Sequence, residues 1–192
     1  MIRHPLIRQV RLYNQFSRLS NLFLSNTLPP TATGCDHGKG SAMVTIPTYD
    51  KTRADARAIF DAAVNRVNPV TMMAQSLKLD GNTLRVTDGS DAWTYDLSSF
   101  SRVFATGMGK ATARMALGLE QVLCQRLTDG LIAVKEGHTE VLATIRLIEA
   151  SHPLPDHRSE AAAMSLLDLG ATLGTKLAKD DLVIVMVSGG GS

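Results

Sequence analysis

The amino-acid sequence predicts an α/β protein in which helices cover both faces of a parallel sheet. From residue 102 onward, short β-branched runs alternate with helical patterns, and this alternation is typical of a parallel α/β layer. The last of these runs, residues 182–187, is apolar throughout, as expected of a strand covered on both faces. With 44% hydrophobic and 20% charged residues among 192, the composition is that of a soluble globular domain.

Three elements are expected before this layer. A first amphipathic helix begins with the capping pattern of Thr52 and Asp55 and continues with apolar residues at helical spacing. Asn68 and Pro69 end this helix and can cap a second, short one, because proline is tolerated at the first helical position. Residues 77–86 predict a hairpin, with an Asp-Gly turn at its middle.

The layer itself begins with a strand at residues 103–105, followed by a glycine-containing turn and a helix that ends near Leu123. Strands at 131–134 and 145–148 come next. The segment between these two strands is shorter than the dozen or so residues that a parallel crossover usually needs, so the place of the second in the sheet stays open. A helix over 159–173 then leads to the last strand.

Residues 1–42 differ in composition from residues 43–192. They contain four arginines and several serines, and no acid comes before Asp36. We therefore expect an extension outside the domain that residues 43–192 form. It is either a mitochondrial transit peptide or a translated upstream stretch before a true start at Met43. The first interpretation predicts a mitochondrial location, and the second a cytoplasmic one.

The charge balance and the cysteines exclude several classes of protein. The 20 basic and 18 acidic residues give a formal charge of +2, which offers no argument for nucleic-acid binding. No run reaches the roughly 18 apolar residues of a membrane span. Cys35 and Cys124 lie far apart, so neither a zinc site nor a disulfide framework is indicated, and the ligands of any metal stay unknown.

Three loops are candidates for a functional site, because ligands of open α/β sheets bind at the carboxyl ends of the strands. In the first loop, Gly107 and Gly109 let the main chain approach an anion, and Lys110 adds a mobile positive charge at a helix start. The loop is not a Walker A motif, because Ala111 stands where that motif needs serine or threonine. A purely structural tight turn is the alternative.

The second and third loops follow later strands. Residues 152–156 include two prolines, which restrict the backbone and could hold His152 and Asp156 toward a ligand. Alternatively, Asp156 only caps the following helix. Residues 188–192 contain three glycines between two serines, which suits close approach of a ligand to the main chain. The alternative for this loop is a flexible tail.

Taken in order, these motifs resemble the amino-terminal domain of glycerate 2-kinases of the MOFRL type. The resemblance covers residues 49–192 and depends on the whole series, since each motif alone is weak. Met108 stands where the family usually has alanine, which leaves the glycines and the lysine of the turn in place. The matching segments are 53–60, 107–111, 129–138, 149–156 and 180–192.

The resemblance implies a Rossmann-like parallel sheet with helices on both faces, truncated before the second (MOFRL) domain. It implies transfer of the γ-phosphoryl group of ATP to D-glycerate, giving 2-phosphoglycerate, with Mg²⁺ on the phosphates. Lys110 matches the family's catalytic lysine. Because the missing MOFRL domain would supply the other half of the cleft, we expect the chain alone to turn over poorly or not at all. The expected substrate- and nucleotide-binding residues are Gly107, Gly109, His152, Pro153, Pro155, Asp156, Ser188, Gly189, Gly190, Gly191 and Ser192.

Two other functions stay open. One is a nicotinamide-dependent hydroxypyruvate reductase, a label that relatives of this kind have carried, with Glu136 on a cofactor ribose. Thr112, in place of the third glycine of the dinucleotide motif, argues against it. The other is a non-catalytic remnant that binds a small anion. We also expect aggregation or a homo-oligomer, because the last strand would present an uncovered apolar edge.

Overall fold

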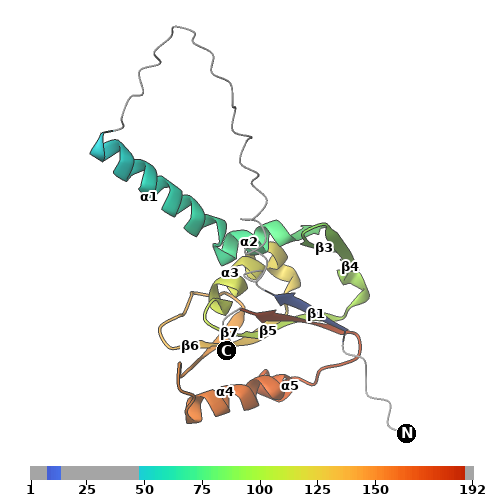
Figure 1. Ribbon diagram of the computed structural model, residues 1–192. Coiled ribbons are helices and arrows are strands. Elements are labelled where there is room, and N and C mark those ends of the chain that lie inside the picture. Colours follow the sequence, from blue (N-terminus) through green and yellow to red (C-terminus); the bar gives the residue numbers. More distant parts are fainter. Residues whose placement is uncertain (1–7, 14–47, 189–192) are drawn as a thin grey trace. The chain divides into compact units, whose positions relative to one another are not determined.

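The computed structural model describes residues 8–13 and 48–188 (Figure 1). The chain divides into two compact units, one combining residues 1–14 with 67–192 and the other comprising residues 15–66. The domain boundary expected between residues 42 and 43 lies outside the described residues and stays a prediction. Within the described ranges, no helix has the length and apolar character needed to cross a bilayer.

The larger unit contains a five-stranded sheet in which all neighbouring strands run parallel, in the order β1-β8-β5-β6-β7. Strands β5 to β8 confirm the four strands expected from the apolar runs of the sequence. The strands are β1 (Arg8–Tyr13), β5 (Arg102–Met108), β6 (Asp129–Lys135), β7 (Ile145–Ala150) and β8 (Asp181–Val187).

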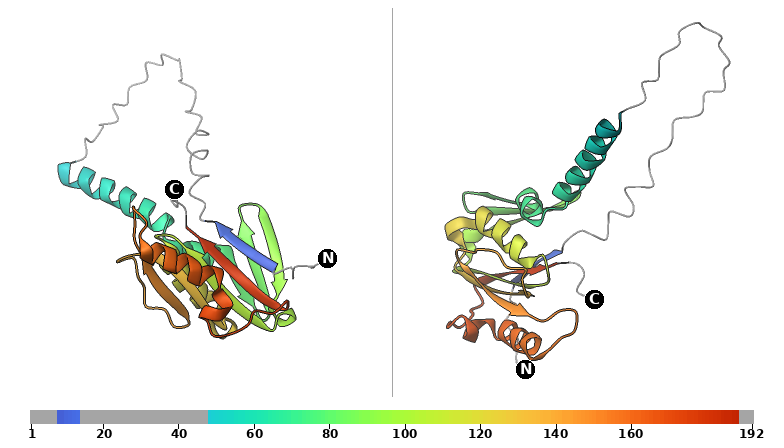
Figure 2. Two further views of the ribbon diagram at one scale, coloured as in Figure 1. Left: turned by 90° about the horizontal axis from the view of Figure 1, so that it is seen from below. Right: turned by 90° about the vertical axis from the view of Figure 1, so that its left-hand side faces the viewer.

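Helices lie on both faces of this sheet, as predicted (Figures 1 and 2). Val103 and Ala105 pack into the core beneath α2 and α3, whereas Phe104 packs with Leu169 on the opposite face. This division follows from the alternation of side chains along a strand. One face carries α2 (Pro69–Ser76) and α3 (Thr112–Leu123), and the other carries α4 (His157–Leu167) and α5 (Leu169–Thr172).

Strand β7 lies parallel to β6 at one edge of the sheet, which settles the placement that the sequence left open. The connection between the two strands contains no helix. It is held instead by Glu120 of α3, whose carboxylate accepts hydrogen bonds from the backbone N–H groups of Ala143, Thr144 and Ile145, each at 2.8 Å. A side-chain anchor thus replaces the usual crossover helix.

A small antiparallel sheet precedes β5. The predicted hairpin is confirmed as β2 (Leu77–Asp80) and β3 (Thr83–Asp88), and β4 (Asp91–Asp96) adds a third strand. A short 3₁₀ turn, η2 (Leu97–Ser99), leads from β4 toward β5, and η3 (Cys124–Arg126) follows α3. These elements complete the core on the α2 and α3 side.

Residues 8–13, which we expected to be part of an extension, form β1 and pair with β8 from Leu182 to Val187. The expectation of a bare β8 edge was therefore wrong, because β1 takes the place beside β8 while β5 takes the other side. The reason that we gave for self-association does not hold in this arrangement. Whether the chain forms homo-oligomers stays a prediction.

Two helix boundaries differ from the predictions. The first helix, α1 (Tyr49–Arg66) of the smaller unit, begins before Thr52, and Thr48 accepts a hydrogen bond from the N–H of Lys51 at 3.4 Å. Asp55 is therefore in the second turn, where it pairs with Lys51 at 2.7 Å. The helix expected over 159–173 is interrupted because Asp168 starts a new one, α5, by accepting the N–H of Ala171.

Candidate functional site

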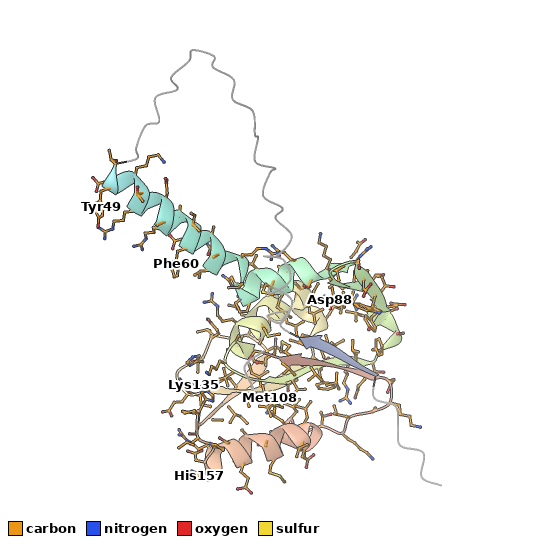
Figure 3. All side chains as sticks on the ribbon, in the orientation of Figure 1. Tyr49, Phe60, Asp88, Met108, Lys135 and His157 are labelled. Atoms are coloured by element: carbon orange, nitrogen blue, oxygen red, sulfur yellow. The ribbon has the colours of Figure 1, made fainter. Side chains whose placement is uncertain are left out.

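A cleft of about 480 Å³ lies at the carboxyl ends of β5, β6 and β7. It is formed by the loop after β5, the end of β6, the loop after β7 and one side of α4. In Figure 3 the labelled side chains of Met108 and Lys135 lie at the end of the sheet near the start of α4. The lining residues are Met108, Gly109, Lys110, Ala133, Val134, Lys135, Ala150, Ser151, His152, Pro153, Pro155, Ser159, Ala162, Ala163 and Leu166.

Both glycines of the first loop are required by close contacts with the β8 segment. A Cβ at Gly107 would lie 2.2 Å from the backbone oxygen of Met186, and one at Gly109 would lie 2.1 Å from Oγ of Ser188. Gly109 also has a φ of +119°, a conformation that side chains rarely adopt. The alternative that the glycines serve the geometry of a tight turn therefore explains why both positions need glycine. Gly109 and Lys110 also line the cleft, whereas Gly107 does not.

The loop leads into α3, whose amino end has no side-chain cap. Ala111 at the N-cap position provides no hydrogen bond to the helix start. The first backbone N–H groups of a helix have no partner within the helix, so this end favours an anion. Thr112 is fully buried, and its Oγ1 has no hydrogen-bond partner among the described residues. The N–H groups of Ala111 and Thr112 are bonded within the loop region, to Oγ of Ser188 and to the backbone oxygen of Gly109, so Lys110 is the charged group that this loop brings to the cleft.

Of the third loop, the structure describes only Ser188, and residues 189–192 lie outside the described part. Ser188 is buried. Its N–H donates to the backbone oxygen of Met108 at 3.2 Å, and its Oγ accepts from the N–H of Ala111 at 3.2 Å. Ser188 therefore holds the first loop in place through these two hydrogen bonds, and it does not line the cleft. The assignments of Gly189, Gly190, Gly191 and Ser192 stay predictions.

In the second loop, His152, Pro153 and Pro155 line the cleft, but Asp156 does not. Asp156 caps α4 by accepting the N–H groups of Arg158 and Ser159, which is the structural alternative that the sequence suggested. Burial acts to raise the pKa of Asp156, but hydrogen bonds from the side chain and backbone of Arg158 outweigh it and lower that pKa. The carboxylate of Asp156 is thus bound by Arg158 and by the backbone N–H groups at the start of α4.

The electrostatic environment favours a neutral imidazole at His152. Burial lowers its pKa from the ordinary value of 6.5, and the positive charges of Lys110 and Lys135 lower it further, as does His138. Near neutral pH the ring can therefore accept a hydrogen bond or a proton from a ligand hydroxyl. His152 is half-buried within the cleft lining.

Two residues near the cleft were missed by the sequence analysis. Lys135, the last residue of β6, lines the cleft, and attention to residues that end strands would have found it. Arg158 of α4 binds the carboxylates of Glu136 at 2.9 Å and Asp156 at 3.0 Å. No sequence signal predicts that bridge. Residues 8–13 and 48–188 contain no cluster of three or more His, Cys, Asp or Glu residues suited to a metal ion.

The fold and this cleft define an α/β domain with a cleft, lined by Lys110 and Lys135, at the carboxyl ends of its strands. A family model described as "Domain of unknown function (DUF4147)" matches residues 55–192. The chain belongs to this family.

Named relatives agree with the resemblance found in the sequence. The chain is similar to a glycerate kinase of Mus musculus, with 34% identity over 153 residues, covering 71% of this chain and 27% of the relative. A glycerate 2-kinase of Pyrococcus horikoshii is 34% identical over 91 residues, covering 47% and 19%. A protein of Agrobacterium vitis, provisionally named hydroxypyruvate reductase, is 42% identical over 91 residues, covering 47% and 23%. The chain thus spans about a quarter of the length of such relatives.

A solved structure of a Pyrococcus horikoshii protein has the same fold over most of the described chain. The TM-score is 0.58 at 26% sequence identity, and the match covers 73% of this chain and 30% of that one. The arrangement of sheet and helices is therefore shared with a longer protein.

Proposed function

We propose that this chain provides one half of the active site of a glycerate 2-kinase, which transfers the γ-phosphoryl group of ATP to D-glycerate. The observation that carries the proposal is the position of Lys110 in the cleft, directly before the uncapped start of α3. Phosphoryl transfer depends on positioning and on neutralising negative charge, and this arrangement supplies both.

The described residues fit the phosphates of a nucleotide. Lys110 provides a mobile cation in the cleft, and the dipole of α3 places a partial positive charge at the helix end that directly follows it. ATP supplies the phosphoryl group, and Mg²⁺ offsets the charge on its phosphates. Because no carboxylate lines the cleft among the described residues, we infer that the metal enters on the nucleotide. The chemistry of this half of the site is therefore the binding of oxyanions.

The acceptor is a hydroxy acid, which brings a carboxylate and a hydroxyl to the same cleft. A cleft lined by Lys110 and Lys135 suits the carboxylate, and a neutral His152 can accept a hydrogen bond from the hydroxyl. We infer that the remaining groups of the site come from a MOFRL domain, which supplies the opposite wall. The chain alone is then expected to bind ligands weakly.

The reductase alternative has less support. A nicotinamide cofactor needs a free acid at the end of the second strand for its ribose, and here the carboxylate of Glu136 is bound by Arg158 at 2.9 Å. Thr112 also occupies the position of the third glycine and is fully buried. We therefore propose kinase chemistry as the function of this cleft.

A coupled assay for ADP release tests the proposal. ATP, Mg²⁺ and D-glycerate are supplied to the chain alone and to the chain with a separately produced MOFRL domain. Each form is also tested with Lys110→Ala and with Lys78→Ala, an exposed lysine of β2 that serves as control. We expect turnover with the added domain, lost in Lys110→Ala and kept in Lys78→Ala. No turnover in any combination would favour a non-catalytic remnant.

A further inference from the structure

We propose that Lys135 is the second anion-binding group of the cleft, and that it holds one oxyanion of the ligand together with Lys110, beside His152. This inference rests on the proposed function and extends it to a residue outside the sequence-derived site.

The register of three adjacent strands brings the three residues to the same end of the sheet, where all three line the cleft. Met108 of β5 pairs with Ala133 of β6, and Lys135 of β6 pairs with Ala150 of β7. Lys110 follows Met108 by two residues, as His152 follows Ala150. Lys135 thus ends the middle strand, between the strands that lead to Lys110 and to His152.

Lys135 also points to the same face of the sheet as Ala133, another residue of the cleft lining. Residues two apart on a strand point to the same face, so Lys135 shares its face with Ala133, and both line the cleft. Its side chain is half-buried, which reduces solvent screening of its charge. The N–H of Gly109 donates to the backbone oxygen of Ala133 at 3.1 Å, which ties the first loop to β6.

The acids near the cleft are bound elsewhere. Arg158 takes the carboxylates of Glu136 and Asp156, and the carboxylate of Glu149 accepts the N–H of Gly137 at 2.7 Å. Over residues 8–13 and 48–188, neither Lys110 nor Lys135 forms an ion pair.

Two unpaired ammonium groups in one cleft repel each other, and an anion between them relieves that repulsion. Both lysines lower the pKa of His152, as expected if both ammonium groups lie near its ring. The ligand group is therefore an oxyanion. It comes either from a nucleotide phosphate or from the carboxylate of the hydroxy acid.

Binding of two probes to the full chain, followed by calorimetry or by NMR, tests this inference and separates the two sources. The probes are ADP and D-glycerate. Lys135→Met is expected to reduce the affinity for the probe that supplies the oxyanion by about tenfold. This loss is in the range of one hydrogen bond to a charged group. Lys135→Arg keeps the charge and should retain most of the affinity. Lys78→Met, at the exposed control position, should change neither.

A second readout does not depend on affinity. The pKa of His152, followed by NMR, should rise in Lys135→Met, because one of the charges that lower it is removed. Thermal melting of each variant verifies that it folds.

Unchanged affinity for both probes in Lys135→Met would overturn the inference, as would the absence of saturable binding of either probe to the unsubstituted chain. Loss of binding in Lys110→Met with no change in Lys135→Met would overturn the inference while leaving the proposed function intact. If the complete site keeps its kinase activity in both Lys110→Met and Lys135→Met, that result would count against the proposed function itself.

Discussion

Ser188 lies directly against Gly109, so that the last described residue of the chain supports the loop that carries Lys110. A Cβ at position 109 would lie 2.1 Å from Oγ of Ser188, and that Oγ accepts the N–H of Ala111 at 3.2 Å. The residue that follows β8 thus helps to fix the loop after β5.

Gly109→Ala should therefore destabilise the chain through both a clash and a strained backbone, by roughly 1–3 kcal/mol. Gly137→Ala is a matched control, because Gly137 also has a positive φ but has no atom within 4 Å of the added Cβ. Urea unfolding measures the difference. The Gly109→Ala/Ser188→Ala double variant, which lacks Oγ, should recover part of the lost free energy of unfolding. Equal destabilisation by Gly109→Ala and Gly137→Ala would argue against a clash with Ser188.

The lowered pKa of His152 predicts a loss of stability at acid pH. The folded state disfavours the imidazolium, so the unfolded state binds the proton more readily. The free energy of unfolding should then decrease as the pH falls below 6.5 and level off below the folded-state pKa. Chemical unfolding at several pH values, compared between the wild type and His152→Gln, measures this term. Relative to His152→Gln, the wild type should lose stability as the pH falls through this range, and parallel curves throughout would contradict the prediction.

Arg158→Met should weaken anion binding in the cleft without a large effect on stability. The substitution removes the positive charge that neutralises the carboxylates of Glu136 and Asp156, and their negative charge then opposes an incoming anion. Arg146→Met is the control, because Arg146 forms a similar ion pair with Asp129, at 2.8 Å, among residues that do not line the cleft. Titration with ADP at low ionic strength should show weaker binding only in Arg158→Met. Equal effects of both substitutions would point to net charge as the cause.

Glu120→Ala should destabilise β7 and the connection before it. The substitution leaves three backbone N–H groups without their carboxylate acceptor, at a cost of about 1–3 kcal/mol. Hydrogen exchange should accelerate at Ile145 more than at residues of β5. Uniform acceleration along both strands would mean that the anchor does not act locally.

Deletion of residues 1–14 should expose the edge of β8 that β1 covers. An apolar edge strand without a partner pairs readily with other chains. Light scattering after size-exclusion chromatography should show self-association of the shortened chain at concentrations where the full chain does not associate. A stable monomer on deletion would indicate that β1 contributes little to the sheet. The mass of the protein isolated from cells would show whether these residues are retained.

The apolar strands β5 to β8 and the cap of α2 by Asn68 could be predicted because their signals are local. Strand β1 could not, because its pairing depends on an edge that only the folded sheet creates. The interruption at Asp168 was missed because the apolar pattern continues through it.

The loops of the candidate site were partly predictable. Lys110 and His152 were found by their place after parallel strands, and both line the cleft. The ion pair of Arg158 with Glu136, and the position of Lys135 between its neighbours, depend on contacts between separate elements that a single sequence does not reveal.

The most direct test of the central claim is to identify the phosphorylated product by ³¹P NMR after incubating ATP, Mg²⁺ and D-glycerate with the chain and a MOFRL domain. We expect 2-phosphoglycerate, formed by the wild type and by Lys78→Ala but not by Lys110→Ala. Absence of any phosphorylated glycerate, or oxidation of a nicotinamide cofactor with hydroxypyruvate in its place, would contradict it.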